Sequence, residues 1–525
     1  MIAASEPRHD GDARSRKPRW TSVLAAASGA LFATAAPPFD FYLGIPLGLV
    51  GFAYALLPSD EARGHRRRGA FVGWLFGLFA NLVALRFVPE VVVRFASLPS
   101  IAGWTALVLL SAAQAIPWAF AGLVIRIVRT RLPDVPSWLA FGTGVYVATF
   151  VPAVFPWTPA GGMTPWPAFV QTAELIGERG TTFLIAVVAG LCALAIQHGR
   201  ERAFRTMALA LGVATAIVVV MLGWGTLRMR QVAQLREGAP HADVALVQPG
   251  FDAYERWDAS RAVTMLDRLT ALTKSAESRG AELTVWPESS YPYTLPHATR
   301  HTPTGSRAIL QYGVRGPVLT GVYMSGGAGL GYNSAVLATA DGTVSKPYDK
   351  RHLLWFGETV PLADSFPWLR KVFARGTGLV PGTESVLFTT DAIRAAVLNC
   401  YEDTLPQAGR EAMEVRPNLL VNVTNDAWFT GSGEGELHLR LAALRAIEAR
   451  RDLVRAVNQG PTSFVDATGR VRARYSDALP ATLQVSAALL ESPVTLFTRF
   501  GDAPLVLLLT ASLAFPLARS RRTNR

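Results

Sequence analysis

The chain has 525 residues, of which 50% are hydrophobic and only 17% are charged, and its net charge is +12. A chain of this length exceeds what one hydrophobic core usually organises, so we expect two or more domains. Arginines cluster beside apolar segments instead of alternating with aromatic residues, which argues against nucleic-acid binding, and two cysteines in unlike settings argue against a disulfide framework.

A seven-span membrane region is predicted over residues 20–225. The basic, polar residues 1–19 precede it as a tail that we expect to be disordered and cytoplasmic. A basic segment before an apolar run also resembles a cleavable signal, but further apolar runs follow at once, which favours an uncleaved first span. After an eighth span, residues 519–525 form a second cytoplasmic tail. The predicted spans are residues 20–36, 43–57, 70–87, 102–127, 137–155, 180–197, 206–224 and 503–518.

The connections between the spans alternate in charge, and this alternation predicts their orientation. The connections on the side of the N-terminus are all basic: residues 63–68, 126–131, 200–205 and 519–522. The opposite connections, residues 37–41, 88–100 and 155–166, contain Arg94 as their one basic residue. Positive charge concentrates on the cytoplasmic side, so both termini are expected in the cytoplasm. The large insert after the seventh span then lies outside it, in the periplasm of a bacterium that has one.

The insert, residues 242–490, reads as one α/β domain. Strand-like runs alternate with a few helix-period stretches, and no internal repeat is visible. The expected strands are residues 244–248, 283–286, 318–323, 334–338, 395–399, 419–423, 453–457 and 462–466, and the expected helices are residues 259–279 and 436–451. Three of these strands end abruptly in polar residues, at Glu288, at Cys400 and at residues 424–429. Open α/β sheets build their sites at such strand ends.

Cys400 is the candidate nucleophile of the insert. A lone cysteine after an apolar run is usually a small buried hydrophobe, so its neighbours decide the interpretation. A nucleophilic thiol needs a base to take its proton and a cation or donors for the oxyanion. Glu288 and Lys350 could supply these, although each alone could be a helix-cap neighbour or a solvated loop charge. The eight histidines show no convincing metal-ligand spacing, so no metal is predicted.

Taken in order, these segments resemble the carbon-nitrogen hydrolase (nitrilase) superfamily. The segments that carry the resemblance are Trp286-Pro287-Glu288, Tyr348-Asp349-Lys350-Arg351-His352-Leu353, Phe356-Gly357-Glu358, Cys400-Tyr401-Glu402 and Thr424-Asn425-Asp426-Ala427-Trp428-Phe429. With the flanking spans, they are similar to one branch, the apolipoprotein N-acyltransferases. The resemblance implies an α-β-β-α sandwich with Glu288 as general base, Lys350 stabilising the tetrahedral intermediate and Cys400 carrying the acyl group as a thioester.

Five further residues match supporting positions of the family. Glu358 and Glu402 could orient Lys350, or could form a purely structural ion pair. Trp257 and Trp428 could line an acyl-chain pocket, or could belong to the core. Tyr401 matches by its place after the cysteine. The chain departs from the family at Trp355, at Asp403 and in the loop of residues 429–435, which leaves loop shape and substrate preference open.

The resemblance implies an integral enzyme of the bacterial inner membrane, with its catalytic domain on the periplasmic side and no cofactor. A phospholipid acyl chain would move to Cys400 and then to the α-amino group of a diacylglyceryl-cysteine at a lipoprotein's N-terminus. One alternative is a membrane-tethered amidase acting on a small soluble substrate. Another is a transporter or scaffold with an inactive hydrolase domain, although polar residues within the spans are few, chiefly Asn81 and Gln114.

Overall fold

The computed structural model describes most of the chain. It covers residues 17–57, 65–96, 99–327, 329–355, 357–360, 363, 365–368 and 378–523. The predicted tail of residues 1–19 therefore lies almost entirely outside the described residues, as do Phe356 and the last two residues of the C-terminal tail.

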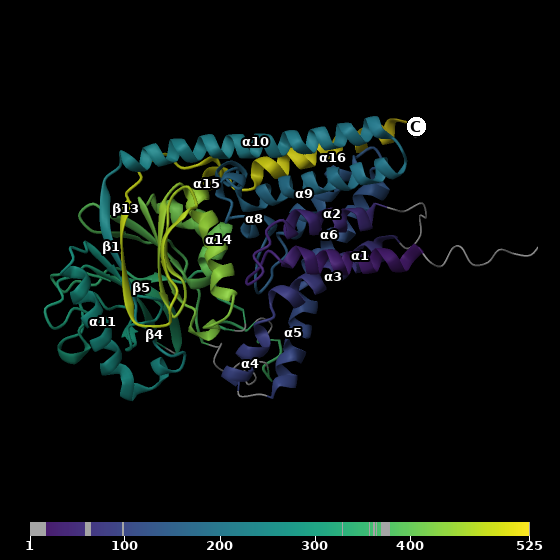
Figure 1. The fold of residues 1–525 in the computed structure, drawn as a ribbon. Coiled ribbons are helices and arrows are strands. Elements are labelled where there is room, and N and C mark those ends of the chain that lie inside the picture. The colour runs from purple at the N-terminus through teal and green to yellow at the C-terminus, as the bar shows by residue number, and fades with distance from the viewer. Residues whose placement is uncertain are drawn as a thin grey trace, which may run out of the picture.

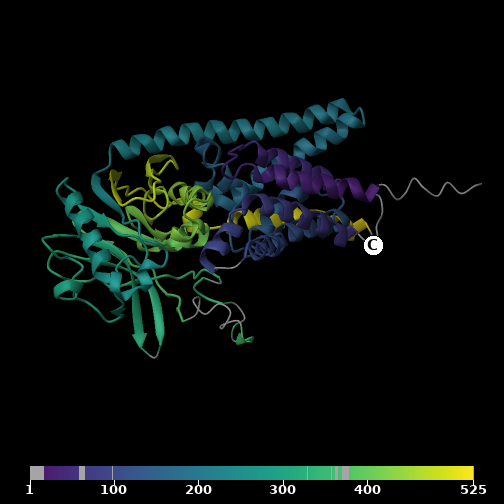
Figure 2. The same cartoon turned by 60° about the horizontal axis from the view of Figure 1, so that its bottom comes forward.

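The molecule has a helical region and a region of two β-sheets, which lie side by side along its length (Figure 1). Figure 2 shows the same division after a rotation of the view. The helices of the first region are α1 (Lys17–Ala33), α2 (Gly44–Leu56), α3 (His65–Ala84), α4 (Val88–Ala96), α5 (Ser100–Gln114), α6 (Ile116–Arg131), α7 (Ser137–Ala148), α8 (Pro159–Gly162), α9 (Ala173–Arg200), α10 (Phe204–Glu237), α15 (Leu496–Phe500) and α16 (Ala503–Thr523).

A helix lies at each of the eight predicted spans, but their length supports fewer crossings. Three helical stretches of the described chain are long and apolar enough to cross a membrane: Ser100–Arg131, Ala173–Arg200 and Phe204–Glu237. A fourth exists if Arg66–Ala84 and Val88–Arg94, which bend by 55°, form one span. The other apolar helical stretches among the described residues are shorter: Trp20–Ala33, Gly44–Leu56 and Ala503–Ala514. Eight spans therefore stay a prediction, and residues 88–100, expected as a plain connection, contain α4.

Small residues let the helices of this region approach closely. A Cβ atom on Gly29 of α1 would clash with the carbonyl oxygen of Phe76 on α3, and one on Gly73 of α3 would clash with that of Trp118 on α6. Close backbone approach of this kind is the main way in which helices pack when apolar burial alone cannot hold them together. Stacked and edge-on rings of Phe32, Phe52, Phe76 and Trp118 fill the space beside the glycines.

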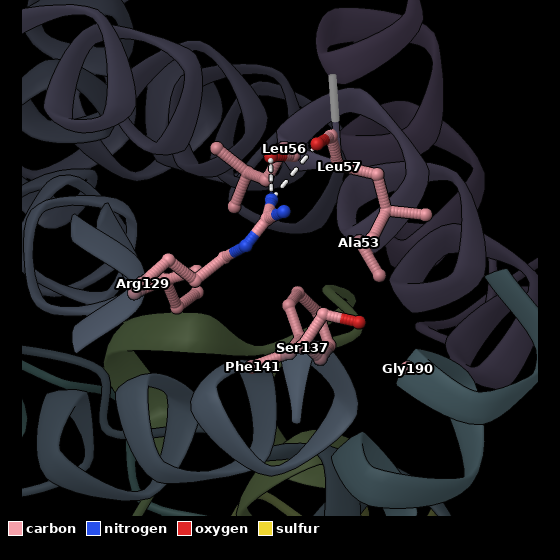
Figure 3. Close-up of a pocket in the computed structure, with 8 residues that line it drawn as sticks. Ala53, Leu56, Leu57, Arg129, Ser137, Phe141 and Gly190 are labelled. Carbon is pink, nitrogen blue, oxygen red and sulfur yellow. Dashed lines mark hydrogen bonds between the residues drawn. The ribbon is translucent and has the colours of Figure 1, made fainter. Parts of the chain in front are cut away.

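A small pocket lies between α2, α6, α7 and α9, and it contains none of the candidate site residues (Figure 3). Arg129 of α6 reaches across this pocket to the end of α2. Its Nη1 atom donates hydrogen bonds to the carbonyl oxygens of Leu56 and Leu57, at 3.0 and 2.8 Å. The last carbonyls of a helix lack partners within the helix, so a guanidinium group there caps α2 and complements its dipole. The pocket is thus part of the helix packing.

The second region is built from two stacked sheets. One contains β1 (His241–Gln248), β2 (Leu283–Val285), β3 (Leu295–Pro296), β4 (Val318–Gly327), β5 (Leu330–Ala338), β6 (Tyr348–Asp349) and β13 (Ala481–Ala488), in the order β13-β1-β2-β4-β5-β6 with β3 beside β4. The other contains β7 (Leu387–Thr389), β8 (Arg394–Asn399), β9 (Leu419–Asn425), β10 (Asp452–Asn458), β11 (Thr462–Val465) and β12 (Val471–Tyr475), in the order β12-β11-β10-β9-β8-β7.

Apolar side chains between the two sheets form the central core, and helices cover both outer faces. Val244 and Val285 of the first sheet belong to one buried cluster with Val397 and Val421 of the second. Helix α11 (Ala262–Glu277) packs on the outer face of the first sheet, while α13 (Pro406–Ala412) and α14 (Glu434–Ala449) pack on that of the second. These layers make the α-β-β-α sandwich expected from the sequence. The expected helices over residues 259–279 and 436–451 correspond to α11 and α14.

The insert leaves the helical region and returns to it at one place. Strand β1, which follows α10, pairs with the last strand β13 in an antiparallel register from His241 opposite Ala488 to Gln248 opposite Ala481. Because the first and last strands are neighbours, the chain closes its sandwich next to the point where it began. Figure 1 shows α10 running along the helices and ending beside these two strands.

Buried ion pairs join α14 of the sandwich to α9 of the helical region. Arg445 is fully buried and lies 2.7 Å from Glu178 of α9 and 2.9 Å from Glu448 of its own helix. The backbone N–H of Glu178 also donates to Glu448, at 2.7 Å. Nearby, Arg450 pairs with Glu174 at 2.7 Å. Charges taken out of water need such partners, so the two regions are held together by compensated charge as well as by apolar contact.

Replacing Arg445 with Met should destabilise the whole protein. The change leaves Glu178 and Glu448 buried without their shared cation, and breaking a buried pair in this way costs about 3–5 kcal/mol. We expect a clearly lower unfolding midpoint for the detergent-purified protein in a thermal scan. Arg474→Met is the matched control, because Arg474 is 47% exposed in its pair with Glu436, and such surface pairs contribute only about 0–1 kcal/mol. Equal effects of the two changes would contradict this assignment.

Candidate active site

Glu288, Lys350 and Cys400 meet at the ends of strands from both sheets. Glu288 follows β2 by three residues, Lys350 comes directly after β6, and Cys400 comes directly after β8. Strands β2 and β6 belong to the first sheet and β8 to the second. The three residues are far apart in the sequence, so only the stacking of the sheets brings them together. The structure therefore places all three sequence-predicted residues in one site.

Lys350 is held between two carboxylates. Its side chain is 1% exposed, and its Nζ atom lies 2.8 Å from Oε2 of Glu358 and 3.3 Å from Oε1 of Glu288. Burial alone lowers the pKa of Lys350, but Glu358 and Glu288 outweigh burial and hold that pKa well above its ordinary value. The ammonium group is thus a permanent positive charge. It is suited to stabilise an oxyanion, and Glu358 is its nearest carboxylate partner.

Cys400 occupies a backbone conformation that favours glycine. Its φ angle is 54°, in the left-handed region, at the point where β8 turns into the short helix Cys400–Thr404. A non-glycine residue rarely adopts this region unless its surroundings impose it. Here Asn422 of β9 imposes it, because its Nδ2 atom donates to the carbonyl oxygens of Leu398 at 3.0 Å and Cys400 at 3.1 Å. The turn projects the thiol out of the strand toward the other two side chains.

The thiol of Cys400 is kept protonated in the resting site. Burial raises the pKa of Cys400 well above its ordinary value, the negative charge of Glu288 raises it further, and Lys350 opposes them only in part. A thiol in this state is a weak nucleophile, since the thiolate is the reactive form. Attack on a carbonyl therefore needs a base that takes the proton during the reaction. Glu288 is a carboxylate close enough for its charge to act on this thiol.

Glu402 ties the cysteine turn to the loop that carries Lys350. Its carboxylate is fully buried and accepts hydrogen bonds from the Tyr348 hydroxyl and the Asn399 backbone N–H, at 2.7 and 2.8 Å. It also accepts from the backbone N–H groups of Arg351 and His352, at 2.8 and 3.0 Å. These bonds hold the residues on either side of Lys350. Glu402 thus acts on Lys350 through the backbone, whereas Glu358 contacts its ammonium group directly.

Asn333 is a site residue that the sequence did not reveal. Its Nδ2 atom lies 2.8 Å from Oε1 of Glu288 and 2.7 Å from Oε1 of Glu358, and its backbone carbonyl accepts from the N–H of Lys350 at 2.8 Å. Asn399 donates to its Oδ1 atom at 3.2 Å. One amide thus sets the spacing of both carboxylates around the lysine. Asn333 lies inside β5, and its polarity within an apolar run was the one signal available.

The two candidate tryptophans lie in the loops around the site. Trp257 is 62% exposed, which excludes the core alternative for this residue, and its ring centroid lies 6.2 Å from that of Tyr323. The partly buried Arg256 places its guanidinium over the Tyr323 ring and donates to the carbonyl oxygen of Ser289, next to Glu288. Trp428 meets the ring of Tyr254 edge-on, at 5.5 Å.

Tyr401 is partly buried beside the thiol, and burial raises its pKa to about 12, so its hydroxyl stays protonated. Asp403, a departure from the family pattern, is fully buried. Its carboxylate pairs with Arg455 at 2.8 Å and with His438 at 2.7 Å. The carboxylate of Asp403 is therefore paired with two basic side chains. Trp355, the other departure, is 42% exposed at the edge of the site loop.

A second pocket lies in the helical region. It lies among residues of α3, α5, α6 and α7 and of the loop that follows α7, including Asn81, Gln114 and Phe155. The ring of Phe155 packs against that of Phe429, at 6.3 Å between centroids. Phe429 follows Trp428 in the loop after β9. The helical region thus contacts the loop that carries Trp428 through an aromatic pair.

Comparisons with known proteins find matches to the helical region and to the sandwich. Residues 28–191 match the family model described as the apolipoprotein N-acyltransferase N-terminal domain, and residues 243–488 match that of carbon-nitrogen hydrolases. An apolipoprotein N-acyltransferase of Geobacter metallireducens is 30% identical over 92% of this chain and 92% of its own. One of Brucella melitensis is 31% identical, over 86% of this chain and 87% of its own. A solved amidase of the nitrilase superfamily, from Nesterenkonia, has 18% identity and a TM-score of 0.38 over 51% of this chain and 98% of its own.

The charge of Glu288 makes a testable prediction about the pH dependence of Cys400. A raised pKa keeps the thiol protonated to higher pH, so alkylation by iodoacetamide should be slow at neutral pH. The alkylation rate should rise with pH, and it should level off only well above the ordinary thiol pKa of ~8.5. Glu288→Gln removes the neighbouring negative charge and should lower the pKa of Cys400. Alkylation at mildly alkaline pH should then be faster, while turnover is lost.

The measurement is the rate of mass gain on the peptide that contains Cys400, which separates it from Cys192. Glu414→Gln is the control, because this carboxylate is 64% exposed and pairs with Arg351 outside the triad. Its alkylation profile should match that of the wild type. Slower alkylation in Glu288→Gln than in the wild type would contradict the electrostatic assignment.

Proposed function

The chain belongs to the apolipoprotein N-acyltransferase family, and we propose that it acylates lipoproteins by way of a thioester on Cys400, with a membrane phospholipid as acyl donor. The observation that carries this proposal is the convergence of the buried Lys350 ammonium, the Glu288 carboxylate and the strained Cys400 turn at strand ends of the two stacked sheets. Helices long and apolar enough to cross a membrane lie beside the sandwich that contains this site (Figure 1), which suits an enzyme whose donor and acceptor are both lipids.

In the first half-reaction, Glu288 takes the proton of the Cys400 thiol as the sulfur attacks the ester carbonyl of the phospholipid. A bond forms between sulfur and the carbonyl carbon, and the carbonyl oxygen becomes an oxyanion that Lys350 stabilises. The intermediate collapses by breaking the bond to the glycerol oxygen. That oxygen takes the proton from Glu288 and leaves as a lysophospholipid, while the acyl group stays on Cys400.

In the second half-reaction, the α-amino group of the diacylglyceryl-cysteine attacks the thioester. Glu288 accepts a proton from the attacking nitrogen, and Lys350 again faces the oxyanion. The bond between carbon and sulfur breaks, because a thiolate is a good leaving group, and the sulfur takes the proton back from Glu288. The products are an N-acylated lipoprotein and the resting thiol.

We also propose that both termini lie in the cytoplasm and that the sandwich lies outside it, as the alternation of basic and nearly uncharged connections indicates. Reporter fusions after Arg66, Arg200 and Arg519 should report a cytoplasmic location. A fusion after Gly250, at the end of β1, should report the exterior. A cytoplasmic signal at Gly250 would reverse the orientation, and it would remove access to lipoproteins on the outer side of the membrane.

The acyl-enzyme itself is the decisive intermediate. Purified protein in detergent, supplied with phospholipid alone, should gain the mass of one fatty acyl group on Cys400, and hydroxylamine should remove it. Glu288→Gln should prevent the loading, because the thiol then has no base. A diacylglyceryl-cysteinyl peptide should discharge the acyl group into an N-acyl peptide far faster than water does, since a site that admits lipid excludes water.

The alternatives give different results in the same experiment. Rapid hydrolysis without transfer to the amine would support a membrane-tethered amidase. Failure to load any acyl group from phospholipid, in protein whose Cys400 still reacts with iodoacetamide, would rule out the proposed donor. If Cys400 neither takes an acyl group from phospholipid nor reacts with iodoacetamide, the inactive-domain alternative is supported.

A further inference from the structure

Behind the Cys400 turn lies a buried cluster of charged residues that the acyl-transfer steps do not use. It consists of Asp403 beside the turn, Asp426 in the loop after β9, Glu434 and His438 on the first turns of α14, and Arg455 in β10. Asp403 and Arg455 are fully buried, and Asp426 and His438 are 3% and 5% exposed. Three carboxylates thus share an interior space with one guanidinium and one imidazole.

Three members of this cluster present donor atoms to a common point. Glu434 and His438 are four residues apart on α14, so their side chains lie on the same face of the helix. Asp426 reaches this face from the neighbouring loop. One ligand atom from each of Asp426, Glu434 and His438 can be chosen so that all three lie within 4.8 Å of one another. Nδ1 of His438 lies 3.4 Å from Oδ1 of Asp426. Two ligands of a tetrahedral Zn²⁺ ion with bonds of about 2.0 Å lie roughly 3.3 Å apart.

The second nitrogen of His438 has the partner that metal-binding histidines usually have. Its Nε2 atom lies 2.7 Å from Oδ1 of Asp403, a carboxylate that is itself held by Arg455 at 2.8 Å. A hydrogen bond from a histidine to a carboxylate fixes the ring and its tautomer, and it leaves the other nitrogen to face the ligand. Asp403 therefore orients His438 with Nδ1 toward Asp426.

Unpartnered buried oxygens point to a ligand between these side chains. Oδ2 of Asp426 and Oε2 of Glu434 are inaccessible to solvent and have no hydrogen-bond partner among the described residues. Leaving such atoms without a partner costs several kcal/mol in a folded protein. One divalent cation between Asp426 and Glu434 would provide the missing partner for both oxygens.

We propose that Asp426, Glu434 and His438 bind one divalent metal ion of the Zn²⁺ class, with Asp403 holding the ring of His438. A donor set of one imidazole and two carboxylates suits Zn²⁺, and also Mn²⁺ or Fe²⁺. The ion joins the loop after β9 to the start of α14 and, through Asp403, to the cysteine turn. Its role is structural, since Glu288, Lys350 and Cys400 account for the acyl-transfer steps without it.

The test is the metal content of the full-length protein in detergent, with any histidine tag removed. Protein treated with a chelator, dialysed and titrated with Zn²⁺ should retain close to one equivalent after gel filtration, as measured by elemental mass spectrometry. Glu434→Gln keeps the size of the side chain and should reduce the retained Zn²⁺ at least tenfold. The matched control is Glu436→Gln on the same helix, because Glu436 pairs with Arg440 and Arg474 instead. It should retain one equivalent.

A thiolate also binds Zn²⁺, so Cys400→Ala separates the two sites. The proposal requires that Cys400→Ala keep its equivalent of Zn²⁺. A loss in Cys400→Ala together with retention in Glu434→Gln would place the ion on the thiol and overturn the proposal.

Co²⁺ bound to the wild type gives a readout that does not depend on how any variant folds. We expect weak d–d absorption bands without a thiolate charge-transfer band. A charge-transfer band would overturn the proposal, and so would the absence of stoichiometric Zn²⁺ in correctly folded wild type. In the latter case the cluster is a metal-free network of ion pairs in which Glu434 and Asp426 share a proton.

Discussion

The buried charge of Lys350 is the constraint on which the site depends. An ammonium group removed from water is stable only when carboxylates surround it, and here Glu358 and Glu288 meet this requirement. Two carboxylates around one lysine repel each other, and a hydrogen-bond donor between them reduces this repulsion. Asn333 is that donor. The two carboxylates, the ammonium group and their spacing are therefore one electrostatic unit, and the charges of this unit act on the pKa of the Cys400 thiol.

Helix α14 connects this unit to the helical region. Its first turns carry Glu434 and His438 toward the cysteine turn, while Arg440 and Arg445 further along contact the loop after α1 and helix α9. Each contact is buried and polar, so its geometry is specified more narrowly than that of an apolar surface. Helix α14 is therefore in direct contact both with the helical region and with Asp403 beside the cysteine turn.

The sequence predicted those parts of the site that come directly after strands. Apolar runs that end in Glu288 and Cys400 are visible along the chain, and the resemblance to a known family added Lys350 and its neighbours. Asn333 was missed, because its partners lie on other strands and only the stacking of the two sheets defines them. The pairing of Glu434 with Asp426 was missed for a similar reason, since a spacing of four residues gives two donors and the third comes from another segment. The number of spans could not be predicted securely either, because short turns interrupt apolar runs that look continuous in composition.

The length of helix α10 bears on the position of the sandwich. It contains 34 residues, so at a rise of about 1.5 Å per residue it is about 51 Å long. The hydrocarbon core of a bilayer is about 30 Å thick, which leaves roughly 20 Å of the helix to stand beyond it. Near the C-terminal end of α10, Arg236 pairs with the fully buried Asp452 at 2.8 Å and so joins the sandwich to the helix. The helix is therefore a spacer of fixed length. Because Arg236 ties the sandwich to the C-terminal end of α10, the sandwich and Cys400 with it are held at this end of the helix and away from its other end.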